Sequence, residues 1–161
     1  MIESTNTGRA AASYGSSSHP YLTCGLMPVD ECELQFPAGL VLLTDERMLP
    51  LETVAAEQAG MDFREARRVG EQSIDNAFSD LPPEGWQVIL SHPGTGVTSR
   101  LTAQAPWLQI YSGDLVGRRG AAVEPMTCPP DAFNSGTDLI ALQPGQKPHA
   151  RLPYRRRPSV T

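Results

Sequence analysis

The sequence lacks any apolar run long enough to cross a membrane, which needs about 20 consecutive apolar residues. Its first residues, MIESTNTGRAAASYGSSS, are polar and contain no apolar segment of the signal-peptide kind. An excess of positive charge is also lacking, because the 161-residue chain has a formal net charge of -5. We therefore expect no membrane partner, no nucleic-acid partner and a cytoplasmic location.

Cysteine is scarce as well. Cys24, Cys32 and Cys128 are odd in number and too widely spaced for a close-paired zinc motif. A disulfide framework is therefore not expected, and we predict free thiols that pack as small hydrophobic side chains.

Glycine and proline, in contrast, are plentiful and scattered along the chain. Because proline ends helices and fits poorly in central strands, this distribution favours many short strands joined by turns. A turn motif, HPGTG at 92–96, predicts a hairpin. The predicted strands cover residues 32–43, 86–91, 96–103, 107–113, 120–125 and 137–143.

Three further segments have a distinct composition. Residues 51–81 have the Ala, Glu, Gln and Arg content of a helix, although Gly60 and Gly70 interrupt the stretch. Residues 1–12 resemble a frayed arm. The end of the chain, 149–161, is rich in arginine and proline, and we predict a flexible tail there.

Histidine is limited to His19, His92 and His149. Together with glutamate, histidine suits acid–base chemistry near neutral pH. His19 and His92 each precede a proline, which restricts their backbone to extended conformations, so this feature does not choose between them. His92 lies in the predicted hairpin turn, where exposure to solvent is the simpler explanation.

Glu124 stands at the end of the apolar run GAAV and is followed by Pro125. A carboxylate at the end of a buried strand must be paired, protonated or functional, because burying an unpaired carboxylate costs free energy. Asp75, in SIDNAF, is also explained by an exposed turn. Alternation along 107–113 would place Trp107 and Gln109 on one face, a combination that suits a sugar site.

Taken in order, several segments resemble the aldose 1-epimerase (galactose mutarotase-like) family. They are SYGSSSHPYL, LLTDERMLPLE, DFREARRVGEQSIDNAFSDL, PWLQIYSGD and RRGAAVEPMTCPPDAFNSGTDLIALQPGQ. The resemblance implies a mainly β fold, the galactose mutarotase-like antiparallel β-sandwich (supersandwich), with few short helices. Within 51–81 it favours strands, and we keep only a short helical turn near residues 62–68.

The resemblance also implies roles for four residues. His19, in HPY, matches the histidine that donates a proton to the ring oxygen of the sugar, and Glu124, in VEP, matches the carboxylate that removes the proton from the anomeric hydroxyl. Asp75, in IDNAF, matches an aspartate that hydrogen-bonds sugar hydroxyls, and Gln109, in LQIYSG, matches a polar residue of the same pocket. The implied activity is that of an aldose 1-epimerase (mutarotase) acting on an aldohexose, without a metal or an organic cofactor.

Chains of this family are about twice as long, and the resemblance covers their C-terminal half. Residues 1–148 are therefore predicted to be the C-terminal portion of the sandwich. In the family the other half supplies an arginine and a further histidine; here Arg64, Arg67 and Arg68 lie in the wrong segment, and His92 matches no family position.

A truncated sandwich would leave a sheet edge exposed, so we expect self-association or a partner chain at that edge. We also expect impaired activity. The alternatives are a non-catalytic carbohydrate-binding remnant and a structural fragment of the same fold.

Overall fold

The structure, a computed structural model, describes residues 3–148 and 155–159. Its strands are β1 (Ala12–Tyr14), β2 (Tyr21–Leu22), β3 (Glu33–Gln35), β4 (Leu40–Thr44), β5 (Pro50–Ala55), β6 (Arg67–Arg68), β7 (Asp75–Ser79), β8 (Trp86–Ser91), β9 (Thr98–Ala103), β10 (Trp107–Tyr111), β11 (Ala121–Met126), β12 (Ile140–Leu142) and β13 (Arg155–Ser159). The helical elements are short: η1 (Val29–Glu31), η2 (Asp114–Val116) and α1 (Ala132–Ser135). The predicted mainly β class with few helices is confirmed.

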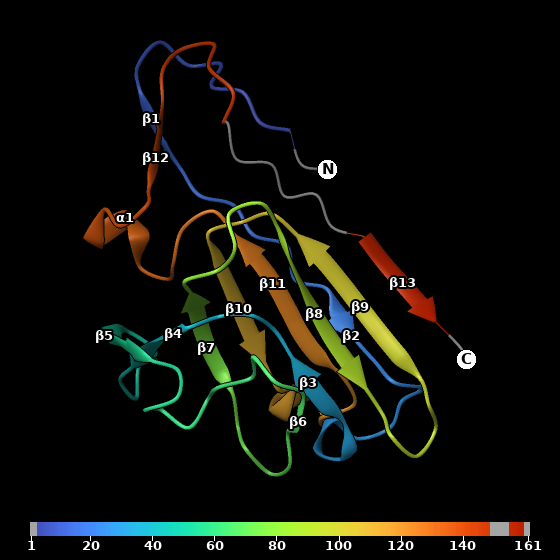
Figure 1. Cartoon of the computed structure of the whole chain (residues 1–161). Helices are drawn as coiled ribbons and strands as arrows, with labels where there is room; N and C mark the ends of the chain where they lie inside the picture. The colour runs from blue at the N-terminus through green and yellow to red at the C-terminus, as the bar shows by residue number, and fades with distance from the viewer. Residues whose placement is uncertain (1–2, 149–154, 160–161) are drawn as a thin grey trace.

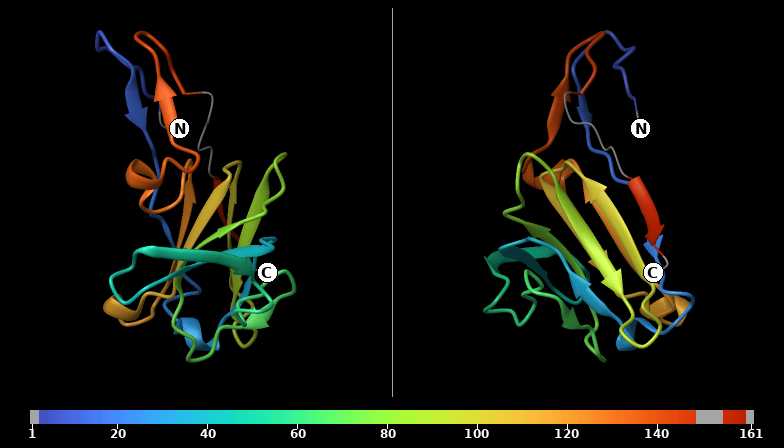
Figure 2. Two further views of the ribbon diagram at one scale, coloured as in Figure 1. Left: turned by 90° about the vertical axis from the view of Figure 1, so that its left-hand side faces the viewer. Right: turned by 45° about the vertical axis from the view of Figure 1, so that its right-hand side comes forward.

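The strands form two antiparallel sheets that pack face to face (Figures 1 and 2). One sheet has six strands in the order β2-β11-β10-β7-β4-β5, and the other has five in the order β13-β9-β8-β3-β6. A separate ribbon of β1 and β12 projects beyond one end of the sandwich (Figure 2). Strands β8 and β9 form the predicted hairpin, and β8 has the bounds that its sequence pattern predicts.

Among the described residues, no helix combines the length and the hydropathy that a membrane span requires.

The inner faces of the two sheets build one hydrophobic core. Leu108 and Ile110 of the six-stranded sheet and Leu90 of the five-stranded sheet are completely buried in it. The ring of Phe36 stacks on Phe63 and meets Phe78 edge-on, with centroids 5.3 and 4.8 Å apart. Each such side chain stabilises the fold by about 1.5–3 kcal/mol through burial. The outer face of the six-stranded sheet is thus free to carry polar groups.

The stretch 32–43 is not one strand, as its apolar pattern suggested, but two strands in different sheets. β3 belongs to the five-stranded sheet and β4 to the six-stranded sheet. Pro37 lies in the crossing segment and has no N–H to donate to a ladder. Phe36 and Ala38, on either side of it, are buried in the core between the sheets.

The helical turn expected near 62–68 is wrong. Phe63 is buried in the core and its carbonyl accepts a hydrogen bond from the backbone N–H of Phe36 at 2.9 Å. Arg67 and Arg68 form β6, opposite Leu34 and Glu33 of β3. Hydrogen-bonded turns occur a few residues earlier, at 56–60 directly after β5, where Gln58 N and Ala59 N donate to Ala55 O. Packing between distant segments therefore overrides the local helix propensity.

The predicted frayed arm is wrong for residues 3–11. The backbone N–H of Asn6 donates to Gln146 O at 3.0 Å, and Asn6 O accepts from Gly145 N at 2.7 Å. The Asn6 side chain is buried and donates to Leu142 O at 2.7 Å. This side chain fixes the start of the chain to the segment that follows β12.

Much of the predicted tail, residues 149–154 and 160–161, lies outside the described residues. Within it, Arg155–Ser159 form β13, which pairs with β9. The division of the chain after residue 148 stays a prediction.

Strand β5 forms one edge of the six-stranded sheet. β5 pairs with β4 alone among the described strands, and its Leu51 is 66% exposed. Association through this edge stays a prediction.

Candidate active site

His19 and Glu124 meet because the segment that contains β2 runs antiparallel along β11. Tyr21 pairs with Ala122, and Ser17 forms an isolated bridge with Met126. The residue midway between the two pairs is His19 on one side and Glu124 on the other, so the two lie opposite each other on one face of the sheet. Their side chains touch, with 3.1 Å between His19 Nε2 and Glu124 Oε1.

The two partners differ in their exposure to solvent. The side chain of His19 is 54% exposed, whereas that of Glu124 is 13% exposed. Burial raises the pKa of Glu124; the positive charge of protonated His19 lowers it, and the nearby negative charge of Asp75 raises it, with a net upward shift from its ordinary value of 4.5. Glu124 is therefore a stronger base than an exposed glutamate, as proton abstraction near neutral pH requires.

Gln109 and Asp75 complete the group. Gln109 of β10 is the direct Cα partner of Glu124, so its side chain lies on the same face. Its Nε2 donates a hydrogen bond to Asp75 Oδ1 at 2.7 Å. Gln109 Oε1 is buried, without a hydrogen-bond partner among the described residues. All four residues chosen from the sequence thus gather on one face, as two contacting pairs.

Sequence reasoning missed two tyrosines that line the same face. Tyr21 and Tyr111 flank Ala122 in the row next to His19 and Glu124. The ring of Tyr21 lies 5.2 Å from the imidazole of His19, centroid to centroid. The position of Tyr21, two residues after His19, could have predicted this, because alternate residues of a strand share a face.

Trp107 forms part of the floor of this face instead of an open stacking surface. As predicted, it shares its face with Gln109, and it packs with Leu42, Ala77 and Met126 in a cluster of buried residues. The Trp107 indole N–H donates to Asp138 Oδ2 at 2.7 Å. The tryptophan therefore supports the row that carries Gln109 and Glu124.

The three arginines at 64–68, which lie in the wrong segment to match the arginine of the family, make their contacts away from the site. Arg64 pairs with Asp62 at 2.6 Å, and Arg67 lies over the ring of Phe63 with its Cζ 4.1 Å from the centroid. Arg68 Nε donates to Asp30 O at 2.9 Å. None of these three contacts involves the four residues of the site.

His92 forms a second histidine–glutamate pair, away from His19. Its Nε2 lies 3.4 Å from Glu31 Oε2, and its Nδ1 accepts the backbone N–H of Thr95 at 3.0 Å. The exposure to solvent expected for His92 in its turn is wrong, because the residue is buried, and this hydrogen bond helps to hold the turn of the β8–β9 hairpin. The pair has the residue types of the site with the burial reversed, His92 at 8% and Glu31 at 46% exposed, and it serves as a control for the site.

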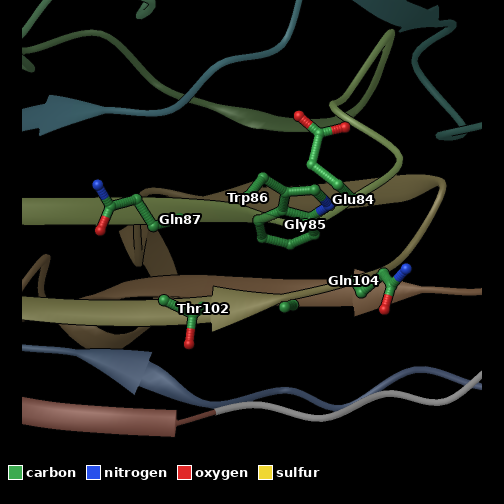
Figure 3. A pocket seen from close by; sticks show the side chains of 7 residues that line it. Glu84, Gly85, Trp86, Gln87, Thr102 and Gln104 are labelled. Carbon is green, nitrogen blue, oxygen red and sulfur yellow. The ribbon is translucent and has the colours of Figure 1, made fainter.

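A hollow of about 530 Å³ lies on the five-stranded sheet, away from these residues (Figure 3). Its lining comes from the start of β8 and the end of β9, with Glu84, Gln87, Thr102 and Gln104 around Trp86. Trp86 is buried, and its indole N–H donates a hydrogen bond to Ala105 O at 2.8 Å. The described residues that line the hollow include no histidine and no pair of acid and base.

Within the part of the chain that the structure describes, no three His, Cys, Asp or Glu side chains gather in an arrangement that could hold a metal ion.

Comparisons with known proteins bear on this arrangement. The model of the aldose 1-epimerase family matches residues 1–155. The uncharacterized protein YihR of Escherichia coli strain K12 is 42% identical over 151 residues, which are 92% of this chain and 47% of YihR.

Solved structures agree. A crystal structure from Escherichia coli K12, provisionally assigned as an aldose 1-epimerase, matches with a TM-score of 0.69 and 26% identity over 89% of this chain and 50% of that one. A galactose mutarotase-like protein from Clostridium acetobutylicum matches in fold, with a TM-score of 0.71 at 16% identity over 95% of this chain and 51% of that one. The chain spans about half the length of the relatives it matches.

Proposed function

Since this chain belongs to the aldose 1-epimerase family, we propose that it interconverts the α and β anomers of an aldohexose by general acid and base catalysis of ring opening. The observation that supports the proposal best is the contact between His19 and Glu124, an acid–base pair at facing positions of two neighbouring strands.

Each member of the pair has one role in the proposed reaction. The Glu124 carboxylate takes the proton from the anomeric hydroxyl O1, and the C1–O5 bond breaks as the C1=O1 double bond forms. The leaving ring oxygen O5 takes a proton from the His19 imidazolium. Rotation about C1–C2 and reclosure on the other face of the carbonyl return both protons, so the pair is restored at the end of each turnover. Each positioned proton transfer is worth about 10²–10⁴ in rate.

The resting arrangement suits this cycle. The reaction begins with a protonated imidazole beside a carboxylate, so the pair carries opposite charges at the start. Burial opposes ionisation of Glu124 and keeps its pKa raised. A base with a raised pKa holds the abstracted proton more firmly than an exposed glutamate does, until reclosure of the ring takes the proton back.

Asp75 and Gln109 are proposed to bind the sugar hydroxyls. Asp75 is exposed and keeps acceptor capacity beyond its bond from Gln109. The unpartnered Oε1 of Gln109 can accept a hydrogen bond from a sugar hydroxyl, which would satisfy a buried polar atom.

The test is the optical rotation of freshly dissolved α-glucose or α-galactose after addition of the purified chain. The proposal expects the approach to the equilibrium rotation to be faster than in buffer, and faster in proportion to the protein concentration. A rate equal to that of buffer, for both sugars and at all concentrations, would contradict it.

One observation favours a second candidate. Because the chain spans about half the length of its relatives, it could bind an aldohexose without turning it over. Calorimetric titration separates the two: a saturable heat without acceleration of mutarotation supports carbohydrate binding alone.

A further inference from the structure

Tyr21 stands next to the acid–base pair at a place fixed by the strand register. It is the Cα partner of Ala122, two residues before Glu124 on β11, just as His19 is two residues before Tyr21. Its side chain therefore shares the face of the sheet with both members of the pair. The backbone between His19 and Tyr21 is also held, because Pro20 O accepts a hydrogen bond from Val123 N at 3.0 Å.

Gly120, just before β11, lets the backbone that follows Tyr21 approach closely. A Cβ atom at Gly120 would lie 3.6 Å from Tyr21 Cδ1 and 2.9 Å from Leu22 O. The second distance is shorter than side chains tolerate, so only glycine permits this approach of the two segments. The 3.6 Å distance to the Tyr21 ring is an ordinary van der Waals contact, so Gly120 fixes the backbone next to Tyr21 and not the ring itself.

The imidazole of His19, in contrast, has few restraints of its own. It is 54% exposed, and among the described residues it contacts Glu124 and packs at a tilt on the Tyr21 ring, at 5.2 Å between centroids and 38° between planes. An exposed side chain with a single polar contact readily changes rotamer. The Tyr21 ring covers one side of the imidazole and limits that freedom.

We propose that Tyr21 is a positioning residue, whose ring holds the His19 imidazole with Nε2 directed at Glu124 and at the ring oxygen of the substrate. The inference rests on the proposed function, because it assigns the purpose of this packing to proton transfer from His19. A displacement of about 1 Å in a catalytic group can cost about 10²-fold in rate. The packing is therefore expected to affect the rate constant and not the affinity for sugar.

The hydroxyl of Tyr21 offers a competing explanation. It lies close enough to Tyr111, Glu124 and Asp75 for their charges, together with burial as the largest cause, to raise the pKa of Tyr21 above its usual value. The phenol therefore stays protonated at neutral pH and could donate a hydrogen bond to a sugar hydroxyl. Removing the hydroxyl alone, or the ring as well, distinguishes a ligand of the sugar from a support of His19.

The first arm of the experiment follows the His19 ring by NMR in the full chain without sugar. Tyr21→Leu should move the Hε1 signal of His19 to that of an exposed imidazole, because the ring current of Tyr21 is lost. Tyr21→Phe should leave the signal near its wild-type position. Tyr14→Leu, the same change in β1 outside the site, is the control. A His19 signal that Tyr21→Leu leaves unchanged would overturn the proposal, whether or not the chain turns over sugar.

The second arm measures mutarotation of α-glucose. Tyr21→Leu should lower kcat by about 10- to 100-fold with KM changed by less than about threefold, and Tyr21→Phe should keep kcat within about threefold of wild type. A raised KM with unchanged kcat in Tyr21→Phe would instead assign the hydroxyl to sugar binding and overturn the positioning role. If the wild-type chain shows no rate above buffer, the proposed function fails, and the NMR arm still reports whether the Tyr21 ring packs on the imidazole of His19, without which the positioning role fails too.

Discussion

His19 and Glu124 face each other across two antiparallel segments, and 3.1 Å separates the imidazole Nε2 from the carboxylate Oε1. Neither residue lies in a helix or a long loop, and the strand register places their Cα atoms opposite each other. A change that shifts this register by one residue would turn one of the two side chains to the opposite face of the sheet.

Glu124 is expected to lower stability at neutral pH. Its folded pKa is raised above 4.5, so between 4.5 and the folded value the native chain holds more protons than the unfolded chain. The free energy of unfolding therefore falls as the pH rises through this window and stays lower above it. Glu124→Gln should gain about 0.5–2 kcal/mol at pH 7.5, and the gain should shrink towards pH 4.

Urea unfolding of both proteins at the two pH values measures this gain. Glu31→Gln, the same change in the His92 pair, should alter stability by less than about 0.5 kcal/mol. A Glu124→Gln protein that is less stable than wild type at pH 7.5 would contradict the destabilising role of burial.

Asp75 is expected to shift the acid limb of the pH profile, which burial of Glu124 moves most. Its negative charge contributes to the raised pKa of Glu124, so Asp75→Asn should lower that pKa towards its ordinary value. The rise of kcat/KM with pH, which reports ionisation of the base, should then move to lower pH. The profile of mutarotation between pH 4 and pH 8 shows the shift, with Asp62→Asn, in the ion pair with Arg64, as the control. A limb that stays in place or moves to higher pH refutes this coupling.

Arg118 is expected to be a main support of the loops at one end of the sandwich. Its largely buried guanidinium binds Asp30 and Asp114 and also donates to Gly70 O and Gln72 O. Arg118→Ala should therefore lower the free energy of unfolding by about 2–4 kcal/mol, somewhat less than for a fully buried pair because both carboxylates can regain water.

Arg118→Lys tests whether geometry matters as well as charge. Lysine has no planar fork of donors, so it should recover only part of the loss in urea unfolding. Full recovery would mean that the positive charge alone is sufficient.

The strands with clear alternation were predictable from the sequence. Trp86–Ser91 alternates strongly and is followed by HPGTG, and the structure confirms both the strand and the hairpin. The helical turn near 62–68 was wrong because the local composition does not reveal that Phe63 enters the core and that Arg67 pairs with Leu34. Such contacts join segments about 30 residues apart, and helix propensity, which depends on local composition, does not report them.

The family resemblance is confirmed over nearly the whole chain, and the structure brings together the four residues that the resemblance named. No local pattern contains their arrangement, because it depends on the pairing of β11 with β10 and β2. The packing of Tyr21 on His19 follows from the same pairing and was missed. The chemical roles of the four residues, the absence of a cofactor and the cytoplasmic location stay predictions.

The central claim is that His19 and Glu124 act as one acid–base unit, and a double-mutant cycle of mutarotation rates tests it most directly. His19→Asn and Glu124→Gln should each lower kcat on α-glucose by about 10²–10⁴. The kcat of the double variant should lie only slightly below that of the less active single variant, because the effects of residues that act together are not additive. Glu31→Gln should keep the wild-type rate. Near-wild-type rates in both single variants would contradict the account.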